Sequence, residues 1–154
     1  MSYHISITGH RPGRLKGGYD LESVENQQLL CEMIAELEEQ LSKHKHITIH
    51  TGMALGVDTL VALAGVALKT KCPEQVSLTA EIPCNGQETR WNEEDRQLYQ
   101  ELLTYMDTKT IYQPHYTRSC MFERNTGMVK ASDCVYAVYD GSGKGGTYHA
   151  IKTA

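Results

Sequence analysis

The sequence predicts an α/β protein, a Rossmann-like three-layer sandwich around a mostly parallel, five-stranded sheet. Strand-like segments alternate with helical segments five times along the chain, which is the order typical of a parallel sheet covered by helices on both faces. The polar, glycine-bearing loops all follow strands, so they converge on one sheet edge, where open α/β sheets bind ligands. The length of 154 residues fits a single domain, residues 1–154.

The first half of the chain supplies two strand–helix units. Residues 3–8 are β-rich and Gly9 ends them. Residues 29–41 place large apolar side chains at helical spacing with glutamates opposite, which is typical of a helix that covers a sheet. Residues 47–51 form the second expected strand. The small apolar residues within 59–68 let the next helix pack closely on the sheet.

The second half continues the alternation. Its expected elements are a strand at 76–82, a helix at 93–106, a short strand at 110–113, a helix at 121–131, a strand at 134–139 and a helix from Thr147. The strand at 134–139 is mostly apolar, which predicts a position in the middle of the sheet and not at its edge.

Composition excludes several functions. The net charge is −4, so a general affinity for nucleic acid is not predicted. No apolar run is long enough to span a membrane and no signal peptide precedes the first strand, so we expect a cytoplasmic protein. The five cysteines form no CxxC pair, which disfavours a disulfide framework or a zinc site. His46 and His50 share a strand face without a third ligand, so no metal and no cofactor are expected.

The turn after the last expected strand is the first candidate site. It contains four glycines in six residues and leads into a helix, so backbone N–H groups and a helix N-terminus converge there. Asp140, Gly141, Gly145, Gly146 and Thr147 are its candidate ligand-binding residues. The turn lacks the GxxxxGK[ST] pattern of NTPases. The alternative is that these glycines only make a tight strand-to-helix connection.

Other candidates lie in the loops after the earlier strands. His10 and Arg11 follow the first strand directly, and the alternative for them is an ordinary solvated loop. Gly52 opens the loop after the second strand and is suited to close ligand approach, whereas Asp58 fits a helix-capping role. Arg90 stands beside the single tryptophan, Trp91, which either stacks on a base or anchors the next helix.

Three stretches together resemble the SLOG superfamily, which comprises nucleotide-binding relatives of the Lonely Guy phosphoribohydrolases and of the DNA-processing (Smf) proteins. Residues 52–58 (GMALGVD) resemble the GxAxGxD segment of the DNA-processing branch, and Arg124-Asn125 followed by Met128 resembles its RN helix. Gly145-Gly-Thr147 resembles the phosphate loop of the Lonely Guy branch. Residues 8–12 (TGHRP) are most similar to the small YpsA-type members of Gram-positive bacteria and their phages.

The resemblance covers nearly the whole chain and implies a SLOG sandwich that binds a nucleotide or a nucleotide derivative. The residues that it places in the pocket are Thr8, Gly9, Arg11, Gly52, Arg124, Asn125, Gly145, Gly146 and Thr147. The loops described above add His10, Met53, Arg90, Asp140 and Gly141 to this candidate set. Since SLOG relatives often self-associate, the resemblance also implies a homo-oligomer.

One departure from the family pattern bears on catalysis. The Lonely Guy hydrolases carry a glutamate three residues after the motif threonine, and here that position is Ala150. N-glycosidic cleavage needs a carboxylate to stabilise the transition state or activate water. We therefore rank non-catalytic nucleotide binding first, as a sensor or a sequestering protein, for example a phage protein that captures a cyclic nucleotide or an ADP-ribose derivative of host immunity.

Two alternatives remain. The second hypothesis is a nucleotide N-glycosidic hydrolase whose acid has moved to Asp140 or Asp58. The third is single-stranded DNA binding through a local basic patch, against which stand the acidic net charge and the lack of interleaved aromatic residues. The residues of that patch would be Arg11, Arg14, Arg90, Arg118 and Lys144.

Overall fold

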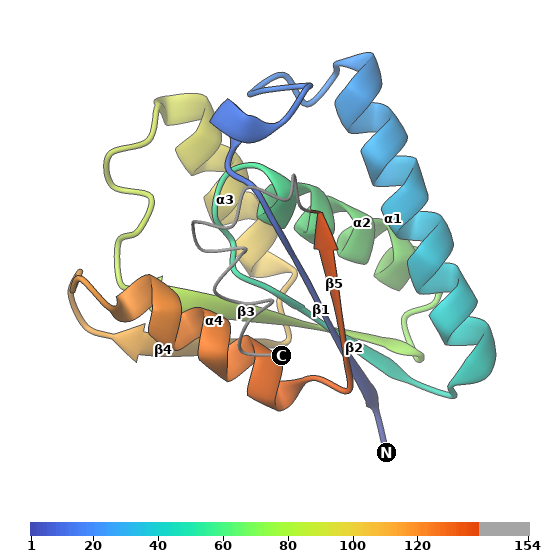
Figure 1. Cartoon of the computed structure of the whole chain (residues 1–154). Helices are drawn as coiled ribbons and strands as arrows, with labels where there is room; N and C mark the ends of the chain where they lie inside the picture. The colour runs from blue at the N-terminus through green and yellow to red at the C-terminus, as the bar shows by residue number, and fades with distance from the viewer. Residues whose placement is uncertain (139–154) are drawn as a thin grey trace.

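The computed structural model describes residues 1–138 and shows one five-stranded sheet, all of whose pairings are parallel. The strand order is β4-β3-β2-β1-β5 (Figure 1). The strands are β1 (Tyr3–Gly9), β2 (Ile47–Thr51), β3 (Val76–Cys84), β4 (Thr108–Gln113) and β5 (Cys134–Val138). The predicted α/β, Rossmann-like arrangement is confirmed.

Four α-helices connect the strands, and a 3-10 turn, η1 (Pro12–Arg14), follows β1. The helices are α1 (Val24–Lys43), α2 (Val57–Lys71), α3 (Glu93–Thr104) and α4 (Cys120–Ala131). Helix α4 covers one face of the sheet, and α1, α2 and α3 lie on the other face (Figure 1). The final helix expected from Thr147 lies outside the described residues.

The two sheet faces differ in chemistry because alternate residues of a strand point to opposite sides. Ile5, Ile47, Ile49 and Leu78 point toward α1 and α2 and form the main apolar core with Leu37. A smaller cluster that includes Ala80, Ile82 and Leu102 seats α3 on the same face. Hydrophobic burial therefore attaches three helices to one side of the sheet.

The face beneath α4 is polar and is held by a row of hydrogen bonds across four strands. His4 Nδ1 lies 2.9 Å from His50 Nε2, and His50 Nδ1 lies 3.3 Å from Glu81 Oε1. The Tyr112 hydroxyl donates to Glu81 Oε2 at 3.0 Å. His50 and Glu81 are both buried. The row stabilises the sheet because each buried polar group in it has a partner.

The expectation that the last strand lies in the middle of the sheet was wrong. In the described residues β5 pairs with β1 alone, at the end of the strand order, and most of its residues are half-buried. Apolar composition reports how well helices cover the faces of a parallel strand, and it does not specify the strand's position in the sheet. Here Tyr136 on β5 bonds to Gln40 and Glu36 of α1.

The loop after β1 is joined to the start of α2. The carbonyl oxygen of His10 accepts a hydrogen bond from the Val57 N–H at 3.2 Å. Gly56, the residue before α2, has a φ of 93°, and an added Cβ would meet that same carbonyl oxygen. Glycine is therefore needed where the β1 loop crosses the N-terminus of α2, and this contact builds one wall of the candidate site.

Candidate functional site

A cavity of about 270 Å³ lies at the carboxyl end of β1. Its walls come from three segments: the end of β1 and its loop, the start of α2, and the first turns of α4. The lining residues are Thr8, Gly9, His10, Arg11, Arg14, Leu55, Asp58, Met121, Phe122, Arg124 and Asn125. Six of the predicted ligand-binding residues meet here, at the sheet edge where such a site was expected.

The side chain of Arg124 is held in the cavity wall by several contacts. Its guanidinium is almost wholly buried, and Nη1 donates to the carbonyl oxygen of Gly52 at 2.6 Å. Nε donates to Asn125 Oδ1 at 2.9 Å, and Nη2 contacts the Met121 sulfur at 3.8 Å. A thioether is a weak acceptor, so of these groups Nη2 has the weakest partner.

Gly52 supports Arg124 from behind. A Cβ added at Gly52 would overlap the Arg124 guanidinium and the Asp58 carboxylate. The space that a side chain at Gly52 would occupy is thus filled by Arg124 and Asp58. The glycine allows the arginine to lie against the backbone at the end of β2.

Asp58 is the single carboxylate among the described lining residues. Its Oδ2 accepts the Ala54 N–H at 3.3 Å and lies 4.0 Å from Arg124 Nη1. Ala54 lies in the loop before α2 and not in its first turn, so the expected helix-capping role of Asp58 was wrong: its carboxylate holds the preceding loop and forms an ion pair with Arg124. Burial raises the pKa of Asp58, and the positive charges of Arg124 and Arg11 oppose that rise.

Among the described lining residues, arginines outnumber carboxylates. Arg11, Arg14 and Arg124 line it against Asp58, although the whole chain carries −4. Burial lowers the pKa of Arg124, and the nearby charge of Arg11 lowers it further, while Asp58 raises it. Arginine stays protonated in proteins, so the guanidinium groups that residues 1–138 contribute to this wall suit an anion.

Three of the described predicted residues do not line this cavity: Gly52, which lies behind Arg124, Met53 and Arg90. Met53, with a φ of 59°, is buried against the α3 cluster, and Arg90 is exposed. Trp91 packs edge-on against Tyr99 with ring centroids 5.3 Å apart, so it anchors α3.

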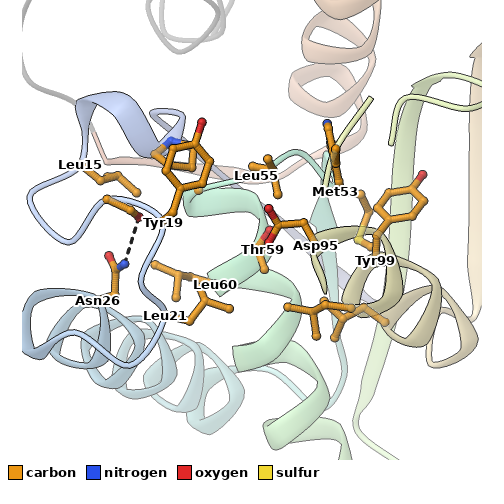
Figure 2. A pocket seen from close by; sticks show the side chains of 16 residues that line it. Leu15, Tyr19, Leu21, Asn26, Met53, Leu55, Thr59, Leu60, Asp95 and Tyr99 are labelled. Carbon is orange, nitrogen blue, oxygen red and sulfur yellow. Dashed lines mark hydrogen bonds between the residues drawn. The ribbon is translucent and has the colours of Figure 1, made fainter. Parts of the chain in front are cut away.

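Met53 and Trp91 border a second, narrow cavity between η1, α2 and α3 (Figure 2). Figure 2 shows Leu55, which also lines the larger cavity, between Tyr19 on one side and Met53 and Tyr99 on the other. The space is about 20 Å³, enough for a water molecule but not for a base. We interpret it as a small gap where the loop after β1 packs against α2 and α3.

Sequence reasoning missed Leu55, Met121 and Phe122 as lining residues. Met121 and Phe122 precede Arg124 within one turn of α4, and residues three apart share a helix face. That spacing was the available signal for Met121. Arg14 and Asp58 were noted in the sequence for other roles, and the structure adds both to the cavity wall.

The glycine-rich turn lies outside the described residues, and so do its candidates Asp140, Gly141, Gly145, Gly146 and Thr147. Within residues 1–138, no cluster of three or more histidine, cysteine or acidic side chains is placed to hold a metal ion. None of the helices in that range is long and apolar enough to cross a membrane.

Comparison with known proteins assigns the chain to a family. A protein of Bacillus pumilus (strain SAFR-032) described as a UPF0398 protein is 24% identical over 152 residues, which cover 97% of this chain and 80% of the relative. An uncharacterized SPbeta prophage-derived protein, YoqJ, of Bacillus subtilis (strain 168) is 27% identical over 134 residues, covering 79% of this chain and 77% of the relative. The YpsA family model matches residues 5–154, and the chain therefore belongs to the YspA SLOG family.

Proposed function

We propose that this protein binds a nucleotide or a nucleotide-derived ligand by its phosphate, as a sensor or a sequestering protein. The observation that carries the proposal is the cavity at the end of β1, whose lining within residues 1–138 includes three arginines and one carboxylate in an acidic chain. Guanidinium groups bind phosphate through paired, charge-assisted hydrogen bonds. The position also fits the rule for ligand sites in open α/β sheets.

The size of the cavity favours a small ligand. Its volume of about 270 Å³ lies near the lower end of the range for small-molecule sites, about 300–1,000 Å³. The described residues thus enclose a phosphate and part of a sugar more readily than two nucleotides. A mononucleotide is therefore the first ligand to test.

The test is to incubate the purified protein with nucleoside monophosphates, cyclic nucleotides and ADP-ribose derivatives and to identify the retained ligand by mass spectrometry. Calorimetric titration then compares the wild type with Arg11→Gln. We expect this variant to lose at least about tenfold in affinity, since a hydrogen bond to a charged group contributes about 1.5–3 kcal/mol.

The matched control is Arg90→Gln. It removes the same charge from an exposed arginine outside the cavity, so its affinity should stay within about twofold of wild type, as one distant surface charge is largely screened. Failure of the wild-type protein to retain any ligand of the panel would contradict the proposal.

One observation favours hydrolysis as a second function. Asp58 lines the cavity, and burial raises the pKa of its carboxyl group, which is a property of general acids. A free base in the supernatant of the same incubation would indicate hydrolysis. Asp58→Asn should then abolish release of the base while the nucleotide still binds.

A further inference from the structure

The side chain of Met121 lies between two arginines of the cavity. The Nη2 atom of Arg11 and the Nη2 atom of Arg124 each lie 3.8 Å from the same Met121 sulfur. The two nitrogens are therefore no farther apart than twice that distance. Two like charges thus converge on a neutral atom that accepts hydrogen bonds only weakly.

Among the described residues, the Met121 sulfur is the contact that Nη2 makes in both arginines. The charge of Arg11 lowers the pKa of Arg124, which reflects their mutual repulsion. The Asp58 carboxylate is 4.0 Å from Arg124 Nη1, on the side of the guanidinium that also bonds to Gly52. An anion between the two Nη2 atoms would relieve the repulsion and replace two weak contacts by charge-assisted bonds of about 2.8 Å.

Resting on the proposed function, we propose that Arg11 and Arg124 form a clamp for one phosphate group and that the Met121 thioether occupies the clamp until the phosphate displaces it. A phosphate with one charge-assisted bond at each side spans the gap between the two arginines. Methionine has three rotatable side-chain bonds and adapts readily. Met121 is half-buried at the cavity wall, so its side chain can turn away without opening the core.

The charge balance selects the kind of phosphate. Arg11 and Arg124 each direct one guanidinium nitrogen at the Met121 sulfur, so a phosphate in that place meets two positively charged groups. A terminal phosphate monoester carries about −1.5 to −2 at pH 7, whereas a cyclic phosphodiester carries one negative charge. The clamp therefore prefers a phosphate monoester.

The decisive variant is Met121→Glu, which attaches a carboxylate to the position that the phosphate would take. Its affinity for adenosine 5′-monophosphate should fall at least about tenfold below that of Met121→Gln, which has the same length and no charge. The thermal midpoint of Met121→Glu should equal or exceed that of wild type, because the carboxylate pairs with both arginines. Tyr116→Glu adds the same charge at an exposed loop outside the cavity and serves as the control for net charge.

A second comparison keeps the proposal testable if Met121→Glu folds poorly. The wild type is titrated with adenosine 5′-monophosphate, with 3′,5′-cyclic adenosine monophosphate and with inorganic phosphate. We expect the monoester to bind at least about tenfold more tightly than the cyclic diester, and inorganic phosphate to compete with it. Equal affinity for monoester and diester, or equal affinity of the Glu and Gln variants, would overturn the clamp.

These outcomes separate the clamp from the proposed function. If the wild type binds no nucleotide, the proposed function fails. If it binds a nucleotide and Met121→Glu binds it as well as Met121→Gln does, nucleotide binding stands and the clamp is wrong.

Discussion

Arg124 and Gly52 form a direct contact between a helix and the end of the neighbouring strand: Nη1 of the arginine lies 2.6 Å from the carbonyl oxygen of the glycine. The same carbonyl also accepts a hydrogen bond from Gln87 Nε2 at 3.3 Å. Because this contact is buried, it fixes the guanidinium in one orientation before any ligand arrives. Such preorganisation lowers the entropy that a ligand must lose on binding.

Substitution of Gly52 should test that orientation. In Gly52→Ala the added methyl group overlaps the guanidinium, so Arg124 has to move out of its position. We expect affinity for the ligand found in the panel to fall about tenfold or more, since a charge-assisted bond contributes about 1.5–3 kcal/mol. Calorimetric titration measures the affinity of each variant. Gly13→Ala is the control, as a Cβ there meets nothing within 4 Å; equal losses in both variants would contradict the prediction.

The helix starts make a prediction about stability. Ser23 accepts the Asn26 N–H at 3.2 Å at the start of α1, and Asn92 accepts the Asp95 N–H at 2.8 Å at the start of α3. Replacing either by alanine should lower the free energy of unfolding by about 1 kcal/mol. Ser119 makes no such capping bond at α4, so Ser119→Ala should change the free energy of unfolding by less than about 0.5 kcal/mol. Urea denaturation measures all three variants, and a loss in Ser119→Ala as large as in the other two would contradict the prediction.

The row of hydrogen bonds beneath α4 predicts coupling between Glu81 and Tyr112. Tyr112→Phe removes the hydroxyl that donates to the buried Glu81 carboxylate. The free energy of unfolding should therefore fall by about 1.5–3 kcal/mol. In a double-mutant cycle with Glu81→Gln, we expect a coupling energy of about 0.5–3 kcal/mol. Tyr105 precedes β4 and is half-exposed. Tyr105→Phe should therefore leave the free energy of unfolding nearly unchanged. Additive losses in the cycle would show that the contact contributes little.

The same row predicts a dependence of stability on pH. Burial and the neighbouring His50 lower the pKa of His4, and Asp133 partly opposes them. The unfolded chain therefore binds a proton at higher pH than the folded one. The stabilising contribution of neutral His4 is present above the unfolded value of about 6.5 and is lost as the pH falls through the folded pKa.

Replacement of His4 should reduce that dependence. In His4→Gln the new side chain can donate to His50 but does not titrate. The free energy of unfolding of this variant should therefore change less between pH 7.5 and pH 5.5 than that of the wild type. Urea denaturation at several pH values measures both slopes. His115→Gln, at an exposed loop position, is the control. An unchanged slope in His4→Gln would show that another group governs the acid response.

Much of the fold could be predicted because periodicity and loop chemistry are local. The amphipathic pattern of residues 29–41 and the β-rich run at 47–51 correspond to α1 and β2. The ends of the helices differ from the sequence pattern where a capping residue sets them. Helix α1 begins at Val24, before the pattern of residues 29–41, because Ser23 caps it. The strand order could not be predicted in this way, since it depends on which strand edges meet, and β5 proved to be at the end of the sheet.

The sequence by itself determined the alternation of strands and helices, the family, and the arginines at the ends of particular elements. The tertiary structure alone decided that Arg124 rests on Gly52 and not on solvent, that Met53 and Trp91 pack with α3, and that Met121 lies between two guanidiniums. Local patterns follow from backbone geometry within a few residues. The contacts of Arg124 with Gly52 and of Arg11 with Met121 join residues more than 70 positions apart, and they follow only from how the helices and loops pack on the sheet.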